Sequence, residues 1–233
     1  MIKLNQENKK YWQKYKTGEI PSVPNLPPTT LLDNIHGPIL DIGTGDGALA
    51  EQLAVQGHEV EAIDLAENIV RANMTRNSKV RYSLQDITQG TNFDGAYFDL
   101  AIFRFTLTNI HKESWRELGV EINRILKPTG KVWILEPLVS ESYRRRYLLA
   151  SKFIDEPHCV YVFKDKELAE KINTEAKLKQ ALANDLVSRI VKHYTIDELK
   201  SIFNTLKLND HRVIEIISPS GFIIKTFEGV FSK

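Results

Sequence analysis

The chain has few of the features that mark secreted or membrane proteins. Among its 233 residues there is one cysteine, Cys159, so no internal disulfide can form. The first residues, MIKLNQENKKYWQKYK, lack the apolar centre of a signal peptide. No apolar run reaches the roughly 18 to 20 residues needed to cross a bilayer. These absences predict a cytoplasmic protein without a membrane partner.

The sequence also lacks an excess of charge of either sign. Lys and Arg together number 31, and Asp and Glu number 30, so the overall charge does not favour nucleic acid as a partner. Cys159 and His158 are adjacent but no cluster of further ligands accompanies them, so no metal site is expected. The composition is that of a single globular domain. We expect it to act on a small molecule, as a monomer or a homodimer.

Hydrophobic periodicity alternates between strand and helix in the first part of the chain. The predicted strands are residues 38–42, 59–64, 80–84, 98–104 and 131–136, and the predicted helices are 48–56, 67–76 and 113–126. The last of these helices is expected to stop at the sequence KPTG. Strands that alternate with helices predict a parallel sheet covered on both faces.

The pattern changes after residue 137. Residues 139–193 are rich in Leu, Lys, Glu and Ala and show no clear strand, which predicts a helical insertion. Thr195 and Glu198 have the spacing of a capping box and predict the start of a further helix. Two β-rich runs around Pro219, Ser220 and Gly221 predict a C-terminal hairpin.

The stretch ILDIGTGDGALAEQL joins the first predicted strand to the first predicted helix. Glycine at 43, 45 and 47 permits a sharp turn and close approach of a ligand, at the strand end where α/β sheets bind ligands. The string formally matches the dinucleotide fingerprint G-x-G-x-x-A, and Asp64 stands where a ribose-binding acid is expected. An NAD(P)-dependent oxidoreductase, or a regulatory nucleotide-binding protein, is therefore one interpretation.

Two further acids favour a different ligand. Asp41 precedes the first glycine by two residues and is suited to hold a cationic amino group, whereas it would repel pyrophosphate. Asp46 adds a second negative charge inside the loop. Five parallel strands followed by a hairpin make seven strands in all. These features favour S-adenosylmethionine over a dinucleotide.

The segments ILDIGTGDGALAEQLAVQGHEVEAIDLAENIVRAN, QDI, FDLAIFRFTLTNI and EINRILKPTGKVWILEP together resemble the class I, seven-stranded S-adenosylmethionine-dependent methyltransferases. The resemblance implies a three-layer α/β/α doubly wound sheet, mostly parallel with a C-terminal antiparallel hairpin, and a helical insertion after the fifth strand. It implies methyl transfer to a small molecule. Residues 1–233 then form one domain: a lid or anchor (1–36), a cofactor-binding core (37–137), an acceptor-side insertion (139–193), and a last helix with the hairpin (195–233).

The resemblance also implies roles for individual residues. The loop at 41–47 would surround the methionine part, Asp64 would bind both ribose hydroxyls, and Leu65 would pack on the adenine. Asp86 and Ile87 would lie at the adenine, with Asp86 accepting from its exocyclic amine, although Asp86 also suits a simple turn. The expected cofactor-binding residues are Tyr11, Trp12, Asp41, Gly43, Thr44, Gly45, Asp46, Gly47, Asp64, Leu65, Asp86, Ile87, Phe103, Arg104 and Phe105.

The acceptor side is less defined. Many relatives carry histidine near position 108, where this chain has threonine, so His111 is the nearest candidate general base; it also suits a helix start. The chain lacks an Asn/Asp-Pro-Pro-aromatic sequence, which disfavours amide and nucleobase acceptors. Trp12 is predicted to close over the site, or else to anchor the N-terminus by packing. The expected substrate-binding residues are Tyr15, Thr108, Glu136, Tyr143 and Arg144.

Overall fold

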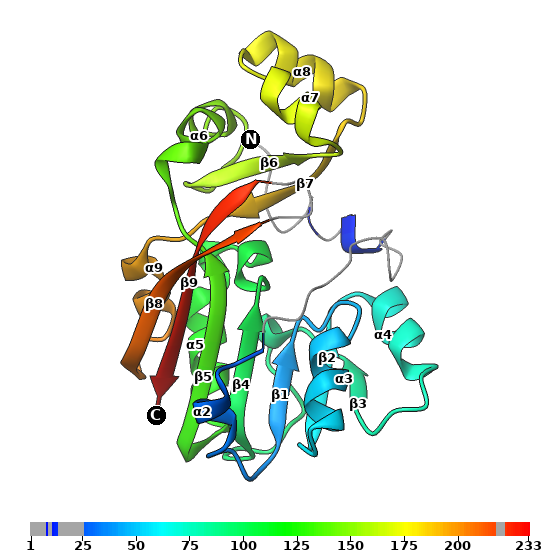
Figure 1. The fold of residues 1–233 in the computed structure, drawn as a ribbon, viewed down its shortest axis with the longest axis vertical. Coiled ribbons are helices and arrows are strands. Elements are labelled where there is room, and N and C mark those ends of the chain that lie inside the picture. Colours follow the sequence, from blue (N-terminus) through cyan, green and yellow to red (C-terminus); the bar gives the residue numbers. More distant parts are fainter. Residues whose placement is uncertain (1–7, 9–10, 14–25, 218–221) are drawn as a thin grey trace.

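A seven-stranded sheet organises the chain in the computed structural model, which describes residues 8, 11–13, 26–217 and 222–233 (Figure 1). The strand order is β3-β2-β1-β4-β5-β9-β8. The first five strands are parallel, and β9 runs antiparallel to both β5 and β8. The strands are β1 (Ile39–Ile42), β2 (Val60–Asp64), β3 (Arg81–Leu84), β4 (Phe98–Arg104), β5 (Leu126–Pro137), β8 (Lys207–Ile217) and β9 (Ile223–Ser232). The predicted fold class is confirmed.

Helices cover both faces of this sheet. On one face, α2 (Thr29–Leu32), α3 (Ala48–Val55) and α4 (Glu67–Met74) share a core with Trp133 and Leu135 of β5. On the other face, α5 (Trp115–Ile125) and α9 (Ile196–Ile202) enclose Phe103. The predicted capping box at α9 is confirmed, because Thr195 and Glu198 exchange their hydrogen bonds there. The result is the predicted three-layer arrangement.

The junction between α5 and β5 differs from the prediction. The helix ends at Ile125, and β5 starts at Leu126, five residues earlier than expected. Phe98 pairs with Leu126 but Leu100 pairs with Lys131, so residues 127–130 bulge out of the ladder. Leu126 is fully buried, which draws the chain into the sheet directly after the helix. The sequence KPTG therefore marks a bulge within the strand.

The insertion after β5 is not wholly helical, so that prediction is wrong in part. It contains α6 (Arg144–Ala150), α7 (Lys166–Lys171) and α8 (Glu175–Ala183), but also β6 (Cys159–Phe163) and β7 (Val187–Lys192), which pair antiparallel. The run CVYVF is β-branched and aromatic, and its side chains are largely buried. Together with the helices it forms a core separate from those of the sheet.

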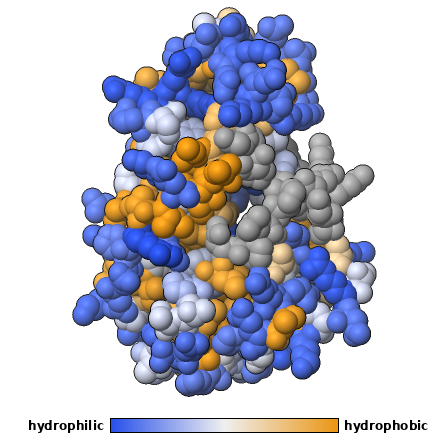
Figure 2. All heavy atoms as spheres, viewed as in Figure 1, coloured by the Kyte–Doolittle hydropathy of each residue, from blue (hydrophilic) through white to orange (hydrophobic). Residues whose placement is uncertain are grey.

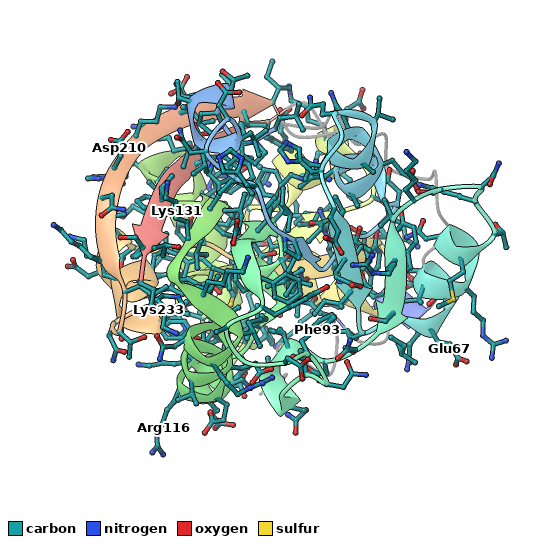
Figure 3. The ribbon with its side chains drawn as sticks, turned by 90° about the horizontal axis from the view of Figure 1, so that it is seen from below. Glu67, Phe93, Arg116, Lys131, Asp210 and Lys233 are labelled. Atoms are coloured by element: carbon teal, nitrogen blue, oxygen red, sulfur yellow. The ribbon has the colours of Figure 1, made fainter. Side chains whose placement is uncertain are left out.

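The insertion lies above the carboxyl ends of the parallel strands in Figure 1. It connects back to the sheet at an isolated bridge between Leu138 and Tyr194. Figure 3, a view from below, shows the charged side chains of Glu67 and Arg116 pointing away from the core. The insertion lies at the end of the sheet at which α/β folds bind ligands.

Apolar side chains gather over the upper parts of β8 and β9 on the face shown in Figure 2. β8 is the last strand of the sheet, and exposed hydrophobic residues of these two strands include Val213, Ile217 and Ile223. Within the described part of the chain, every helix is too short or too polar to traverse a bilayer.

Candidate cofactor and acceptor site

The loop after β1 is held in a conformation that favours glycine. Gly43, Gly45 and Gly47 have φ angles of 71°, 56° and 74°. A Cβ atom added at Gly43 would lie 2.5 Å from Thr106 Cγ2, and one at Gly47 would lie 2.6 Å from the Tyr82 hydroxyl. One added at Gly45 would meet no atom of the described residues within 4 Å. Gly45 therefore borders open space from which a ligand can approach the backbone.

Asp64 stands beside this open space at the end of β2. Its Oδ2 accepts a hydrogen bond from the Gly45 N–H (3.1 Å), and its Oδ1 accepts one from the Ala66 N–H (2.9 Å). Burial raises the pKa of the Asp64 carboxyl, and these backbone donors oppose the rise. The side chain of Leu65, next in sequence, is 43 % exposed. Each carboxylate oxygen can accept a further hydrogen bond, so the geometry suits a diol beside an apolar ring.

The other acids of the loop make its surroundings negative. Asp41 is buried and its Oδ2 accepts a hydrogen bond from the Thr44 hydroxyl (2.8 Å). Burial raises the pKa of Asp41 to about 6; Thr44 and the Arg104 cation lower it, while Asp64 and Asp46 raise it further. Asp46 Oδ1 accepts from the N–H of the first residue of α3 (3.2 Å). Three carboxylates around one loop fit a cationic ligand better than a pyrophosphate.

Sequence reasoning missed a residue that holds the loop. Asn73, on α4, is fully buried, and its Nδ2 donates to the Gly45 carbonyl oxygen (2.8 Å). This bond fixes the backbone at the position that borders open space. An asparagine within a helix pattern carries no local signal of such a role, because its partner lies on another element.

The loop after β4 is tied down from behind by Glu136. This side chain is fully buried and accepts hydrogen bonds from the N–H groups of Thr106 (2.7 Å), Leu107 (2.8 Å) and Thr108 (3.4 Å). Burial raises the pKa of Glu136 to about 8, against the effect of the three donors. Glu136 was predicted to bind substrate, but it is enclosed in the protein and positions the loop instead.

Four more predicted residues belong to β4 and this loop. Phe103 is fully buried and packs on Phe203, with ring centroids 5.6 Å apart, so its ring faces the core rather than a ligand. Thr108 is also buried and donates to the Phe105 carbonyl oxygen (2.9 Å). Arg104 and Phe105 are partly exposed at the carboxyl end of β4. Phe105 has a φ of 55°, a strained conformation for a bulky residue.

Trp12 connects the N-terminal segment to two sides of the loop region. Its Nε1 donates to Asn109 Oδ1 (3.1 Å), and its carbonyl oxygen accepts from Asn68 Nδ2 (3.2 Å). Tyr11 and Trp12 pack edge to face, and the guanidinium of Arg189 on β7 lies 5.4 Å from the Trp12 ring centroid. The predicted aromatic pair thus lies between the cofactor loop and the insertion. Tyr15 lies outside the described residues.

His111 has a structural environment. Its Nδ1 accepts from the Glu113 N–H (3.2 Å) and caps the 3-10 turn Lys112–Ser114, while its Nε2 lies 3.3 Å from Glu156 Oε2. In the neutral imidazole the acceptor nitrogen is therefore already engaged, and the proton is on the nitrogen that faces Glu156. This arrangement gives no support to a role as general base.

Asp86 and Ile87 follow β3. The carboxylate of Asp86 caps the 3-10 turn Ile87–Gln89 by accepting from the Thr88 N–H (3.0 Å) and the Thr88 hydroxyl (2.7 Å). Asp86 is exposed and Ile87 is buried. The turn interpretation of Asp86 therefore has direct structural support, and its contact with adenine stays a prediction.

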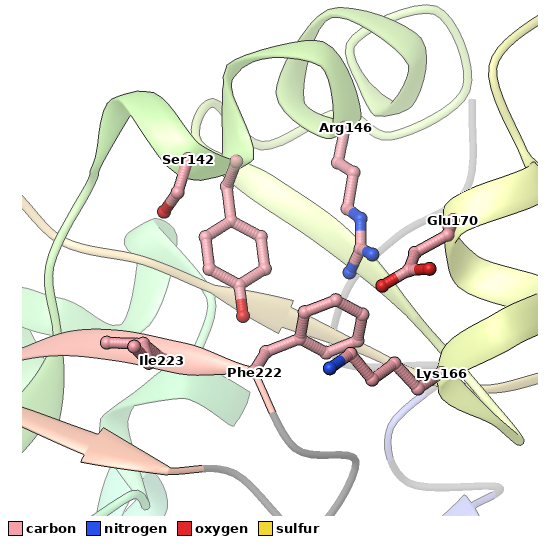
Figure 4. A pocket seen from close by; sticks show the side chains of 7 residues that line it. Ser142, Arg146, Lys166, Glu170, Phe222 and Ile223 are labelled. Atoms are coloured by element: carbon pink, nitrogen blue, oxygen red, sulfur yellow. The ribbon is translucent and has the colours of Figure 1, made fainter.

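The two substrate-binding candidates of the insertion have different surroundings. Arg144 is 73 % exposed and forms an ion pair with Glu141 (3.6 Å). Tyr143 is 6 % exposed and lines a cavity of about 310 Å³ together with Arg146 and Phe222 (Figure 4). Sequence reasoning singled out the arginine-rich run but selected Arg144, and it missed Phe222 because that residue comes from the C-terminal hairpin.

Comparisons with known proteins agree with this geometry. Residues 39–130 match the model of a methyltransferase domain. YqeM of Bacillus subtilis, whose name describes it as a methyltransferase, is 31 % identical to this chain over 98 residues. These residues cover 40 % of this chain and 40 % of that relative. The match to this relative is therefore confined to less than half of either protein.

Solved structures extend the likeness to nearly the whole chain. An S-adenosylmethionine-dependent methyltransferase from Methanosarcina mazei superposes with a TM-score of 0.73 at 22 % identity, covering 89 % of this chain and 98 % of that one. The 1,6-didemethyltoxoflavin N1-methyltransferase of Burkholderia thailandensis, solved with its substrate and S-adenosylhomocysteine, gives 0.56 at 16 % identity, covering 87 % and 73 %. Residues 39–130 therefore match a methyltransferase domain, and the chain shares the seven-stranded fold of these S-adenosylmethionine-dependent methyltransferases.

Proposed function

We propose that the protein transfers a methyl group from S-adenosylmethionine to a small-molecule acceptor. The observation that carries this proposal is the juxtaposition of Asp64 with Gly45, where a buried carboxylate meets backbone that borders open space. The neighbouring exposed side chain of Leu65 supplies an apolar surface. A ribose diol with an attached adenine has the complementary chemistry.

The residues that would hold the cofactor act by binding and orientation. Asp64 would accept hydrogen bonds from the ribose hydroxyls, and the loop at 43–47 would enclose the methionine part, with Asp41 near its amino group. When bound, the cofactor supplies a methyl group on a good leaving group, so an acceptor aligned with the bond needs little acid–base assistance. This agrees with a site in which His111 has a structural environment.

The alternative of a dinucleotide cofactor is disfavoured by charge. Burial raises the pKa of Asp41, and the charges of Asp64 and Asp46 act in the same direction. A pyrophosphate placed in the same loop would add two negative charges to these three. Arg104 acts on Asp41 and Arg76 lies beside Gly47, so these two cations face three carboxylates around the loop.

We further propose that the N-terminal aromatic pair forms part of the enclosure around the methyl group. Trp12 contacts Asn109 of the loop after β4 and faces Arg189 of the insertion. An aromatic face near a sulfonium excludes water and attracts the cation. The acceptor then enters beneath the insertion. The buried free thiol of Cys159 suits a reducing cytoplasm, where we propose that the protein acts as a monomer or a homodimer.

Calorimetric titration with S-adenosylmethionine, S-adenosylhomocysteine and NAD⁺ tests the proposal. We expect saturable binding of the first two and none of the third. Preferential binding of NAD⁺ would overturn the assignment. Release of S-adenosylhomocysteine in the presence of a panel of phenols, amines and aromatic acids then tests for methyl transfer.

A further inference from the structure

The cavity between the insertion and the C-terminal hairpin contains polar groups that the methyl-transfer chemistry does not use. Its volume is about 310 Å³, and its lining comes from the start of α6, from α7 and from the start of β9. Figure 4 shows the Arg146 guanidinium and the Lys166 amine both directed toward the ring of Phe222. The guanidinium carbon lies 4.3 Å from the centroid of that ring, and the Lys166 Nζ lies 5.5 Å from it.

Arg146 is a partly buried cation that forms no ion pair at 4.0 Å or less within the described residues. Glu170 lines the same cavity and acts on this charge from a longer distance. Burial lowers the pKa of Arg146, because the charge is separated from water. The faces of Phe222 and Tyr143 hold the guanidinium in place while its N–H groups make no hydrogen bond to any described residue. Such a group is prepared to bind an anion.

Tyr143 supplies a second donor in the same cavity. The residue is 6 % exposed, and its hydroxyl makes no hydrogen bond to the part of the chain that the structure describes. Its ring is fixed by edge-to-face packing on His193, with centroids 4.9 Å apart. Burial raises the pKa of the phenol, so the hydroxyl keeps its proton. A hydroxyl that borders the cavity and makes no hydrogen bond to a described residue can donate one to a ligand there.

The cavity and the cofactor loop lie at the same end of the sheet, the carboxyl end of the parallel strands. Tyr143 and Arg146 follow the carboxyl end of β5, where Glu136 holds the loop after β4. Phe222 precedes β9, whose residue Thr226 pairs with Pro137 at that end of β5. A molecule anchored in the cavity therefore lies on the side of the sheet where methyl transfer is proposed.

We propose that this cavity binds the oxyanion of an aromatic methyl acceptor, a carboxylate or a phosphate. Arg146 and Lys166 provide charge, Tyr143 provides a hydrogen bond, and Phe222 packs on the attached apolar body. Glu170 offsets one of the two cations, so a single anionic group restores neutrality. This inference rests on the proposed methyl transfer for its statement that the ligand is the acceptor; the anion site itself does not depend on it.

The test uses the full chain saturated with S-adenosylhomocysteine and four probes: benzoate, phenyl phosphate, inorganic phosphate, and benzamide as the uncharged counterpart of benzoate. Binding is measured by calorimetry or ligand-observed NMR. We expect benzoate or phenyl phosphate to bind at least about tenfold more tightly than benzamide and inorganic phosphate. We expect Arg146→Gln to weaken this binding by about tenfold, and Tyr143→Phe to weaken it severalfold.

Arg145→Gln is the matched control, because it removes the same charge from the neighbouring, exposed position of α6. Its affinity for the anionic probe should stay within about twofold of the unchanged protein. Absence of anion binding, equal binding of benzamide, or equal loss in both arginine variants would overturn the proposal. Equal binding of inorganic phosphate and phenyl phosphate would show a site for free anions and would overturn the statement that the ligand is an aromatic methyl acceptor. Failure of S-adenosylhomocysteine to bind, with the anion site intact, would instead contradict the proposed methyl transfer.

Discussion

Two buried carboxylates near the carboxyl ends of parallel strands, Asp64 on β2 and Glu136 on β5, have different surroundings. Both accept hydrogen bonds from backbone N–H groups of a loop, and burial raises the pKa of both. Asp64 accepts from two donors and lies beside the open space at Gly45, whereas Glu136 accepts from three and is fully enclosed. The comparison teaches that residue type and strand position do not separate an acid suited to bind a ligand from a structural one. The two acids differ in how many further hydrogen bonds their oxygens can accept and in whether a ligand can reach them.

The largest expected effect comes from Asp64. Asp64→Ala removes a charged acceptor from the predicted ribose site, so we expect a loss of about 2 to 4 kcal/mol in cofactor binding, or about 30-fold to 1000-fold in affinity. Calorimetric titration with S-adenosylmethionine measures it, with circular dichroism to confirm folding. Asp86→Ala, at an exposed turn, should have a smaller effect. A folded Asp64→Ala protein of unchanged affinity would remove Asp64 from the site.

Glu136 should affect stability more than affinity. Glu136→Gln replaces an acceptor of three backbone bonds, and we expect it to lower the free energy of unfolding by about 1 to 3 kcal/mol. The pKa of this group is raised from 4.5 to about 8 on folding, so the native state binds the extra proton between these values. Its stabilising contribution is present in full below pH 4.5 and is lost as pH rises through 8.

Urea unfolding of both proteins at pH 5 and pH 9 checks this contribution. The difference in stability between the unchanged protein and Glu136→Gln should be larger at pH 5. A difference that does not change with pH would show that Glu136 has an ordinary pKa in the folded protein. A large loss of cofactor affinity without a loss of stability would reverse the contrast with Asp64.

The glycines of the loop after β1 sharpen the same contrast. Gly47→Ala places a Cβ near the Tyr82 hydroxyl, and we expect a destabilisation of about 1 to 3 kcal/mol. The Cβ of Gly45→Ala meets no described atom within 4 Å but would occupy the space proposed for the ligand. Both variants carry the cost of a positive φ. Because only Gly47→Ala also meets a described atom, it should lower the melting temperature more, whereas Gly45→Ala should lower the affinity for the cofactor more. The opposite ranking in both measurements would place the ligand elsewhere.

The smallest effect is expected within the insertion. Tyr147 Oη lies 2.7 Å from His193 Nδ1, and Tyr147→Phe should cost about 1 kcal/mol. Burial lowers the pKa of His193 from 6.5 to about 4. The unfolded state therefore binds the extra proton, and the stabilising contribution of the neutral histidine is lost as pH falls from 6.5 through 4. Thermal melts at pH 4, 5.5 and 7 measure the cost of Tyr147→Phe and the pH dependence of stability. If the melting temperature of a His193→Gln variant depended on pH as that of the unchanged protein does, the assignment to His193 would be contradicted.

Much of the sheet was predictable because burial imposes short apolar runs on parallel strands. β4 has the predicted bounds, and β1 to β3 begin one residue later than predicted. The strands of the insertion were missed because CVYVF is followed by two Lys- and Glu-rich helices, whose composition dominates the segment. No local pattern could find the cavity at Arg146, because Phe222 reaches it from the far end of the chain. Asp64 was predicted because the glycine loop precedes it at a fixed spacing, and its contact with the cofactor stays a prediction. The enclosure of Glu136 depends on tertiary packing.

The position of β8 at the edge of the sheet has a consequence for the behaviour of concentrated samples. An edge strand offers a row of backbone groups to a neighbouring molecule, and charged side chains oppose that contact. Along β8, Lys207, Asp210, Arg212 and Glu215 carry such charges, but the strand ends in Ile216 and Ile217. Intermolecular strand addition is therefore resisted over most of its length, and the apolar end is the place from which aggregation would grow.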